Sequence, residues 1–68
     1  MKAVIKFTNG FGQTEYWGQY GFVKYLLDAK IYDYEDDAFH MVHNTKLAVC
    51  APPIWKTAVV QPVKLVEV

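Results

Sequence analysis

The sequence predicts a small α+β domain, in which an antiparallel β-sheet carries one helix on one of its faces. Three observations indicate this class: residues 2–8 alternate apolar and polar side chains, Asn9-Gly10 follows them directly, and residues 20–30 change to a helical repeat. We expect an N-terminal β-hairpin, one α-helix and then three or four short strands, all within a single domain of 68 residues.

The hairpin is predicted from the alternation and the turn together. In the strand from Lys2 to Thr8, the inward positions are expected to be Ala3, Ile5 and Phe7, with Val4 exposed. Asn and Gly both accept positive φ, so Asn9-Gly10 predicts a two-residue turn. Residues 12–17 should therefore return antiparallel to the first strand.

The helix is predicted over residues 20–30, where the apolar side chains form one stripe: Phe22, Val23, Leu26 and Leu27. No Ser, Thr, Asp or Asn caps its start. After it we expect a short strand at 31–34, an acidic turn at 35–37, and strands at 38–43 and 46–51 around Asn44-Thr45. Pro52-Pro53 should end this ladder.

The last 15 residues, 54–68, are apolar on both faces if they are extended. We expect a strand at 54–60 and a second short strand after Pro62, because proline lacks the backbone N–H that strands use for pairing. A terminal strand is often a sheet edge that can pair with another chain. A domain of this size buries only about 60% of the surface that its unfolded chain exposes. The excess of apolar surface therefore predicts self-association, either along this edge or through a packed face.

Composition restricts the setting of the chain. Hydrophobic residues make up 53% of it and the formal net charge is zero, which argues against disorder. A single cysteine, Cys50, excludes an internal disulfide and favours a reducing compartment, so we expect a cytoplasmic protein. The sequence contains neither a long apolar leader nor a run long enough to span a membrane.

Catalytic and metal-binding patterns are weak. The chain has no serine and no arginine, which excludes a serine nucleophile and a guanidinium clamp. His40, His43 and Cys50 could serve a zinc-dependent or cysteine-dependent hydrolase, but strand geometry would put the two histidines on opposite faces. The acidic residues at 33–37 lack the glycine and the distant glutamate of a calcium loop. We therefore expect neither catalysis nor a metal or other cofactor.

Aromatic residues are the best candidates for binding. Tyr and Trp are enriched where proteins meet, and a core this small cannot absorb every large ring. The candidate interface residues are Trp17, Tyr20, Tyr32, Tyr34 and Trp55. Lysines interleave with several of these rings, so stacking on single-stranded nucleic acid is the alternative. The zero net charge and the absence of arginine argue against nucleic acid.

These observations together predict a non-enzymatic protein-binding module that also self-associates. The partner would be another protein of unknown identity. A short chain without catalytic chemistry is typical of a small regulator, inhibitor or assembly factor, such as phages and mobile elements encode.

Overall fold

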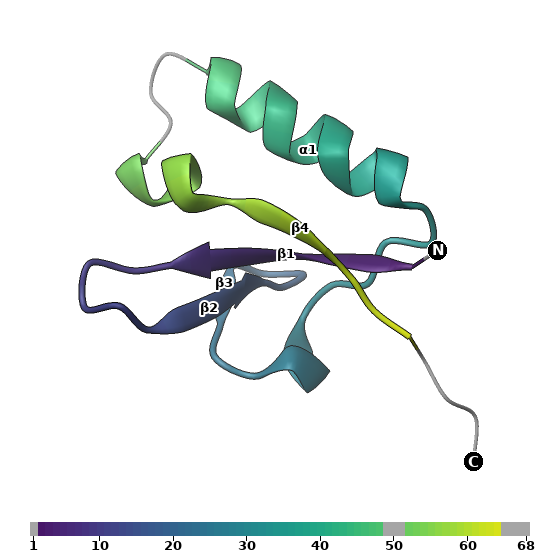
Figure 1. Ribbon diagram of the computed structural model, residues 1–68, viewed down its shortest axis with the longest axis horizontal. Helices are drawn as coiled ribbons and strands as arrows, with labels where there is room; N and C mark the ends of the chain where they lie inside the picture. Colours follow the sequence, from purple (N-terminus) through teal and green to yellow (C-terminus); the bar gives the residue numbers. More distant parts are fainter. Residues whose placement is uncertain (1, 49–51, 65–68) are drawn as a thin grey trace.

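The computed structural model describes residues 2–48 and 52–64 of the chain. Four strands form one antiparallel sheet in the order β3-β2-β1-β4. They are β1 (Ala3–Thr8), β2 (Thr14–Trp17), β3 (Phe22–Val23) and β4 (Val59–Pro62). The helix α1 (Glu35–Leu47) packs on one face of the sheet, and the short 3₁₀ turn η1 (Leu26–Asp28) lies on the other (Figure 1). The predicted class is confirmed: a small antiparallel sheet begins with a hairpin and carries one helix.

The hairpin forms as predicted, but its loop is longer than two residues. β1 and β2 pair from Lys6↔Tyr16 to Thr8↔Thr14, which leaves residues 9–13 as the loop. Asn9 organises it with its side chain, since Oδ1 accepts hydrogen bonds from the amides of Phe11 and Gln13, both at 2.9 Å. The residue with positive φ is Gly12, at 76°, a conformation that glycine adopts without steric cost.

β1 is the centre of the molecule and is buried on both faces. Ala3, Ile5 and Phe7 face α1, as the alternation predicts, and all three are fully buried. The prediction that Val4 is exposed is wrong, because Val4 is 0% exposed. The opposite face is covered at this point by Leu26 and Ile31, from the segment that contains η1. In a central strand that is covered on both sides, the side chains of both faces are buried, so alternation no longer separates buried from exposed positions.

The helix lies later in the chain than predicted. Residues 20–30 form β3 and η1, and residues 35–47, predicted as an acidic turn and a strand, form α1. Three acidic side chains occupy the first turn and Lys46 the last, a distribution that favours the helix dipole. Ala38 and Val42, one turn apart, are the buried residues that anchor α1 on the sheet. The second predicted strand, at 46–51, falls partly in this helix and partly outside the described residues.

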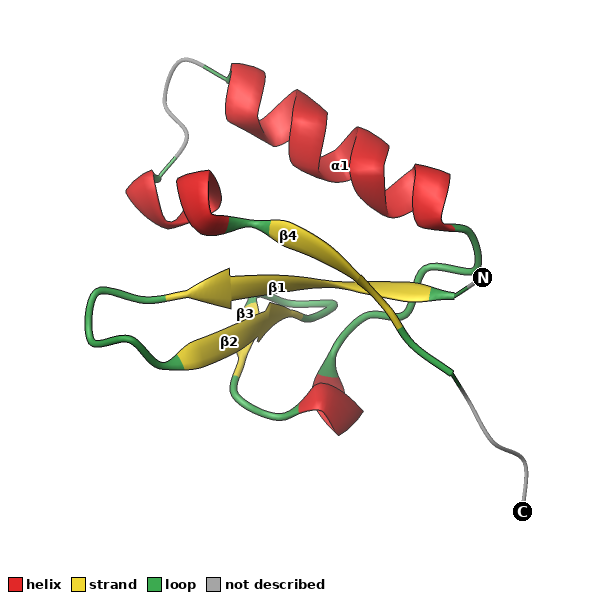
Figure 2. Ribbon diagram, viewed as in Figure 1, coloured by secondary structure: helices red, strands yellow, loops and turns green. Residues whose placement is uncertain are grey.

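The segment after residue 52 also differs from the prediction. Residues 53–57 form a second 3₁₀ turn, η2 (Pro53–Thr57), in place of a strand at 54–60 (Figure 2). Proline at the first positions of a helical turn has a favourable φ and has no amide to satisfy. β4 then begins at Val59, pairs with β1 and forms one edge of the sheet. β4 includes Pro62, so the prediction that this proline separates two strands is wrong. The second strand, predicted after Pro62, lies mostly outside the described residues.

The core is aromatic at the end of the sheet nearest the hairpin. Phe7, Trp17, Phe22 and Trp55 pack edge to face, with Phe7 4.8 Å from Trp55 and Trp17 5.3 Å from Trp55, centroid to centroid. This geometry is the favoured one for aromatic pairs. Trp55 comes from η2, which therefore closes the part of the core that α1 does not cover.

Candidate protein-binding surface

The predicted interface residues do not form one site. Trp55 is 4% exposed and belongs to the core, while Trp17 and Tyr32 pack against that core and are half-buried. Tyr20, in the turn between β2 and β3, and Tyr34, directly before α1, are exposed. Of the five residues, only these two offer most of their ring to a partner.

Tyr32 has a structural position. Its amide donates to the carbonyl of Ala3 at 2.8 Å and its carbonyl accepts from the amide of Ala3 at 3.0 Å, so it continues the sheet beside β1. The ammonium of Lys30 lies 5.0 Å from the centre of its ring. Burial raises the pKa of the Tyr32 phenol above its ordinary value. Because its ammonium lies over the Tyr32 ring, Lys30 is already engaged with an aromatic ring of its own chain.

A different set of side chains forms a continuous apolar surface around η1. Its members line one hollow of about 140 Å³: Val4, Leu26, Leu27, Ile31, Val63 and Lys64. We call it the η1 surface. Val4 is fully buried behind this lining, while Leu26 is 42%, Ile31 41% and Leu27 97% exposed. Apolar side chains of this size are seldom left in water together unless they serve an interaction.

Backbone hydrogen bonds hold the η1 surface on the sheet. The amide of Asp28 donates to the carbonyl of Tyr25 and that of Ala29 to the carbonyl of Leu26, both at 3.1 Å. On leaving η1, the chain is fixed by Lys30, whose amide donates to the carbonyl of Trp17 at 2.9 Å. The leucines are thus presented by a short turn that is closed by its own backbone bonds and is fixed to β2 where the chain leaves it.

The sequence pattern does not predict this surface. It places Leu26 and Leu27 on the buried stripe of a helix over 20–30. A 3₁₀ turn of three residues is too short to bury such a stripe, so both leucines remain at the surface. One feature of the sequence does argue against a helix here: Gly18 and Gly21 make a poor helix start. Gly18 has no room for a side chain, since a Cβ there would lie 2.8 Å from Val23 Cγ1 and 3.0 Å from the carbonyl oxygen of Gly21.

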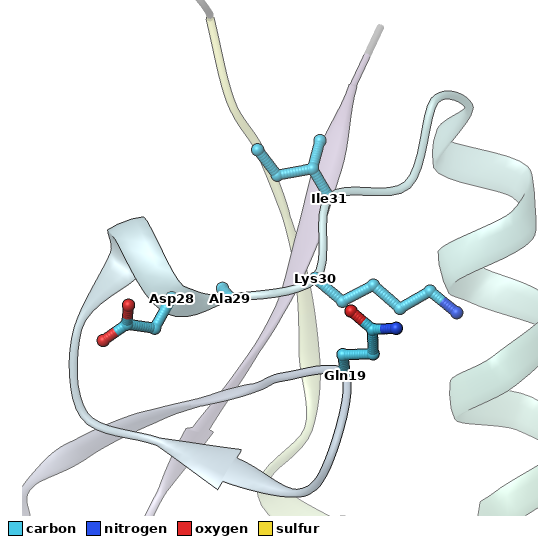
Figure 3. Close-up of a pocket in the computed structure, with 5 residues that line it drawn as sticks. All are labelled: Gln19, Asp28, Ala29, Lys30 and Ile31. Carbon is cyan, nitrogen blue, oxygen red and sulfur yellow. The ribbon is translucent and has the colours of Figure 1, made fainter.

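A larger and more polar hollow of about 500 Å³ lies beside the turn between β2 and β3. Figure 3 shows its lining: Gln19, Asp28, Ala29, Lys30 and Ile31. The side chains of Gln19 and Lys30 lie alongside each other, but Asp28 points away from them (Figure 3). The two charged side chains of this lining, Asp28 and Lys30, therefore do not face each other across the hollow.

The histidines lie on a helix, so the strand predicted over 38–43, which would have placed them on opposite faces, is wrong. His40 and His43 are three residues apart on the exposed side of α1, where that spacing makes neighbours. Cys50, the third candidate ligand and the candidate nucleophile, lies outside the described residues. Among residues 2–48 and 52–64, no group of three or more His, Cys, Asp or Glu side chains is placed to hold a metal ion.

The open edge of β4 offers few backbone groups. The amide of Val63 donates to the carbonyl of Lys2, so by alternation Val60 and Pro62 turn their backbone groups outward. Pro62 has no N–H to offer. Ala58, just before the strand, already donates to the carbonyl of Trp55 and accepts from Lys46 Nζ. Val60 is therefore the one residue of β4 that offers both groups to another strand.

Comparisons with models of known protein families, with curated proteins and with solved structures found no match for this chain. None of the helices in the described part of the chain is long and apolar enough to cross a membrane.

Proposed function

We propose that this chain is a non-enzymatic protein-binding module and that the η1 surface is its binding site. The observation that carries the proposal is the exposure of Leu26, Leu27 and Ile31 around one apolar hollow. Binding sites for side chains are concave and mostly apolar, with few polar groups. Among the described residues, Lys64 is the one charged member of this lining.

Contact through side chains is favoured over the extension of the sheet. β4 offers a single complete pair of backbone groups at Val60, whereas a stable added strand needs a row of them. Packing on a face also uses the apolar area that the chain leaves exposed. A regulator, inhibitor or assembly factor that acts through apolar contacts has these features.

Selection from a random peptide library on the immobilised wild-type protein tests the site without knowledge of the natural partner. The selected peptides are then titrated against Leu27→Glu and, as the matched control, Lys56→Glu. Lys56 is exposed on η2, away from the η1 surface. We expect Leu27→Glu to weaken binding about tenfold or more and Lys56→Glu to leave it unchanged, since apolar anchors at the centre of an interface dominate its affinity. Equal binding to both variants would place the site elsewhere.

A further inference from the structure

We infer that the hollow of the η1 surface accepts the Phe11 ring of a second copy of this chain, in a head-to-tail contact. The inference rests on the proposed function, because the hollow belongs to the η1 surface. It adds the identity of the partner and the residue that enters the site.

Phe11 is presented as an anchor by a loop that is already ordered. Its side chain is 91% exposed. Its backbone is held by the bond from its amide to Asn9 Oδ1, while the amide of Gly12 donates to the carbonyl of Asn9 at 3.0 Å. The amide of Asn9 donates to the carbonyl of Gln13 at 2.9 Å and closes the loop. A loop fixed before binding loses little conformational entropy when its ring is buried.

The hollow fits a phenyl ring in volume and in chemistry. At about 140 Å³ it is comparable with the engineered cavities of about 150 Å³, lined by Leu, Ile and Phe, that bind benzene. The residues beside Phe11 in the loop are uncharged: Asn9, Gly10, Gly12 and Gln13. Docking the loop tip would therefore remove no charge from water. Lys64, in the lining, is a suitable cation to lie over the aromatic ring.

The ring must come from another molecule. The hollow lies beside Val4, near the start of β1, whereas the loop follows the end of this strand (Figure 1). The four residues from Val4 to Thr8 span about 13 Å at about 3.3 Å per residue. The loop continues beyond them, so Phe11 cannot fold back into its own hollow. Each copy then offers one ring and one hollow, and such a contact joins copies in series rather than in closed pairs.

The first experiment is light scattering on the wild-type protein over a concentration series. We expect the mean mass to rise beyond that of a dimer as the concentration increases. Phe11→Ala should weaken association about tenfold or more, whereas Phe39→Ala, which removes an exposed ring of the same type from α1, should not change it. A wild-type protein that stays monomeric, or an association that Phe11→Ala leaves intact, overturns the inference.

The second experiment uses two variants that each lack one half of the contact. Phe11→Ala has lost the ring, and Ile31→Glu puts a charge into the hollow of the other copy. We expect both to be monomers alone and to form 1:1 heterodimers, and nothing larger, when mixed. If Ile31→Glu loses the far-UV circular dichroism of the parent, Leu27→Glu takes its place, since that side chain is 97% exposed. A mixture that remains monomeric contradicts a ring-in-hollow contact.

These outcomes separate the inference from the proposed function. Peptides selected on the η1 surface should still bind Phe11→Ala, because its hollow is intact. If Ile31→Glu abolishes self-association and Phe11→Ala does not, another part of the second copy enters the hollow. The η1 surface would then remain the binding site, and the role of Phe11 would be wrong.

Discussion

The Thr57 side chain joins the 3₁₀ turn η2 to the end of β1 at Thr8. Its Oγ1 accepts a hydrogen bond from the amide of Thr8 at 3.0 Å and lies 3.1 Å from the carbonyl oxygen of the same residue. It also lies 2.7 Å from the carbonyl oxygen of Ile54, within η2. Because Thr8 is the last residue before the hairpin loop, this hydroxyl ties η2 to the end of the strand from which the loop leaves the sheet.

Thr57→Val should destabilise the protein by about 1 kcal/mol, since it removes the hydroxyl while nearly preserving the shape of the side chain. Urea unfolding followed by far-UV circular dichroism measures the change. Thr14→Val is the control, because Thr14 is exposed at the start of β2 and should tolerate the change within about 0.5 kcal/mol. Equal effects would mean that the bonds of Thr57 contribute nothing net.

The burial of Val4 can be tested against a valine on the same face of the sheet. Val4 is fully buried under the η1 segment, and Val59 in β4 is 53% exposed. Val4→Ala should cost about 1–2 kcal/mol of unfolding free energy, because it loses two buried methyl groups. Val59→Ala should cost less than half of this. A small effect at Val4 would show that η1 does not cover the sheet in solution.

The position of α1 predicts an effect of opposite sign to the one that a turn at Asn44-Thr45 would give. Asn44 is exposed within α1. Asn44→Ala should raise the unfolding free energy by about 0.5 kcal/mol, since alanine is the better helix former. In the turn first predicted at Asn44-Thr45, the same change would be destabilising. The sign of the shift in the urea midpoint therefore distinguishes the two structures.

The stability of the fold should fall in alkali because of Tyr32. Burial raises the pKa of its phenol above 10.0, so the folded state retains the proton more strongly than the unfolded state does. This contribution is fully present below pH 10 and is lost as the pH rises through the higher pKa of the folded state. Urea midpoints measured from pH 8 to 11 should decrease less steeply for Tyr32→Phe than for the wild type. Parallel curves for the two proteins would contradict the prediction.

The hairpin was predictable because its determinants are local. Alternation in β1 identified Ala3, Ile5 and Phe7 as buried, and Asn9 marked the turn, although it acts through its side chain. The burial of Val4 was not predictable, because the segment that covers it is more than twenty residues away. The prediction that Val4 is exposed rested on Lys2 and Lys6, which lie on the same side of β1. These lysines mark the two ends of that side, whereas Val4 lies between them.

The helix was predicted in the wrong segment because the apolar spacing indicates the wrong structure both for residues 20–30 and for residues 35–47. Phe22, Val23, Leu26 and Leu27 match a helical stripe, but they belong to a strand and a three-residue turn. In α1, conversely, Phe39 and Leu47 are exposed, so its apolar residues do not gather on one face. The better signals were the acidic first turn and the absence of Gly and Pro from residues 35–47. Both were visible in the sequence.

The binding surface was misjudged because residue type does not determine burial. The prediction treated the aromatic residues as one class of interface candidates, yet Trp55 completes the core while Tyr20 is exposed. The aliphatic residues around η1 were overlooked, because their exposure depends on the absence of a helix there. β4 lies at a sheet edge, which was one of the alternatives that the sequence left open for the apolar C-terminal run.

The two tryptophans of this chain, Trp17 and Trp55, lie within one aromatic cluster, 5.3 Å apart between ring centroids. Tryptophan fluorescence therefore has a single source in this molecule, and the emission of the two indoles should change together. It reports directly whether η2 is seated against β2, but it detects α1 only through that cluster. Fluorescence and far-UV circular dichroism consequently observe different halves of the fold, and a difference between their unfolding curves would reveal whether α1 separates from the sheet first.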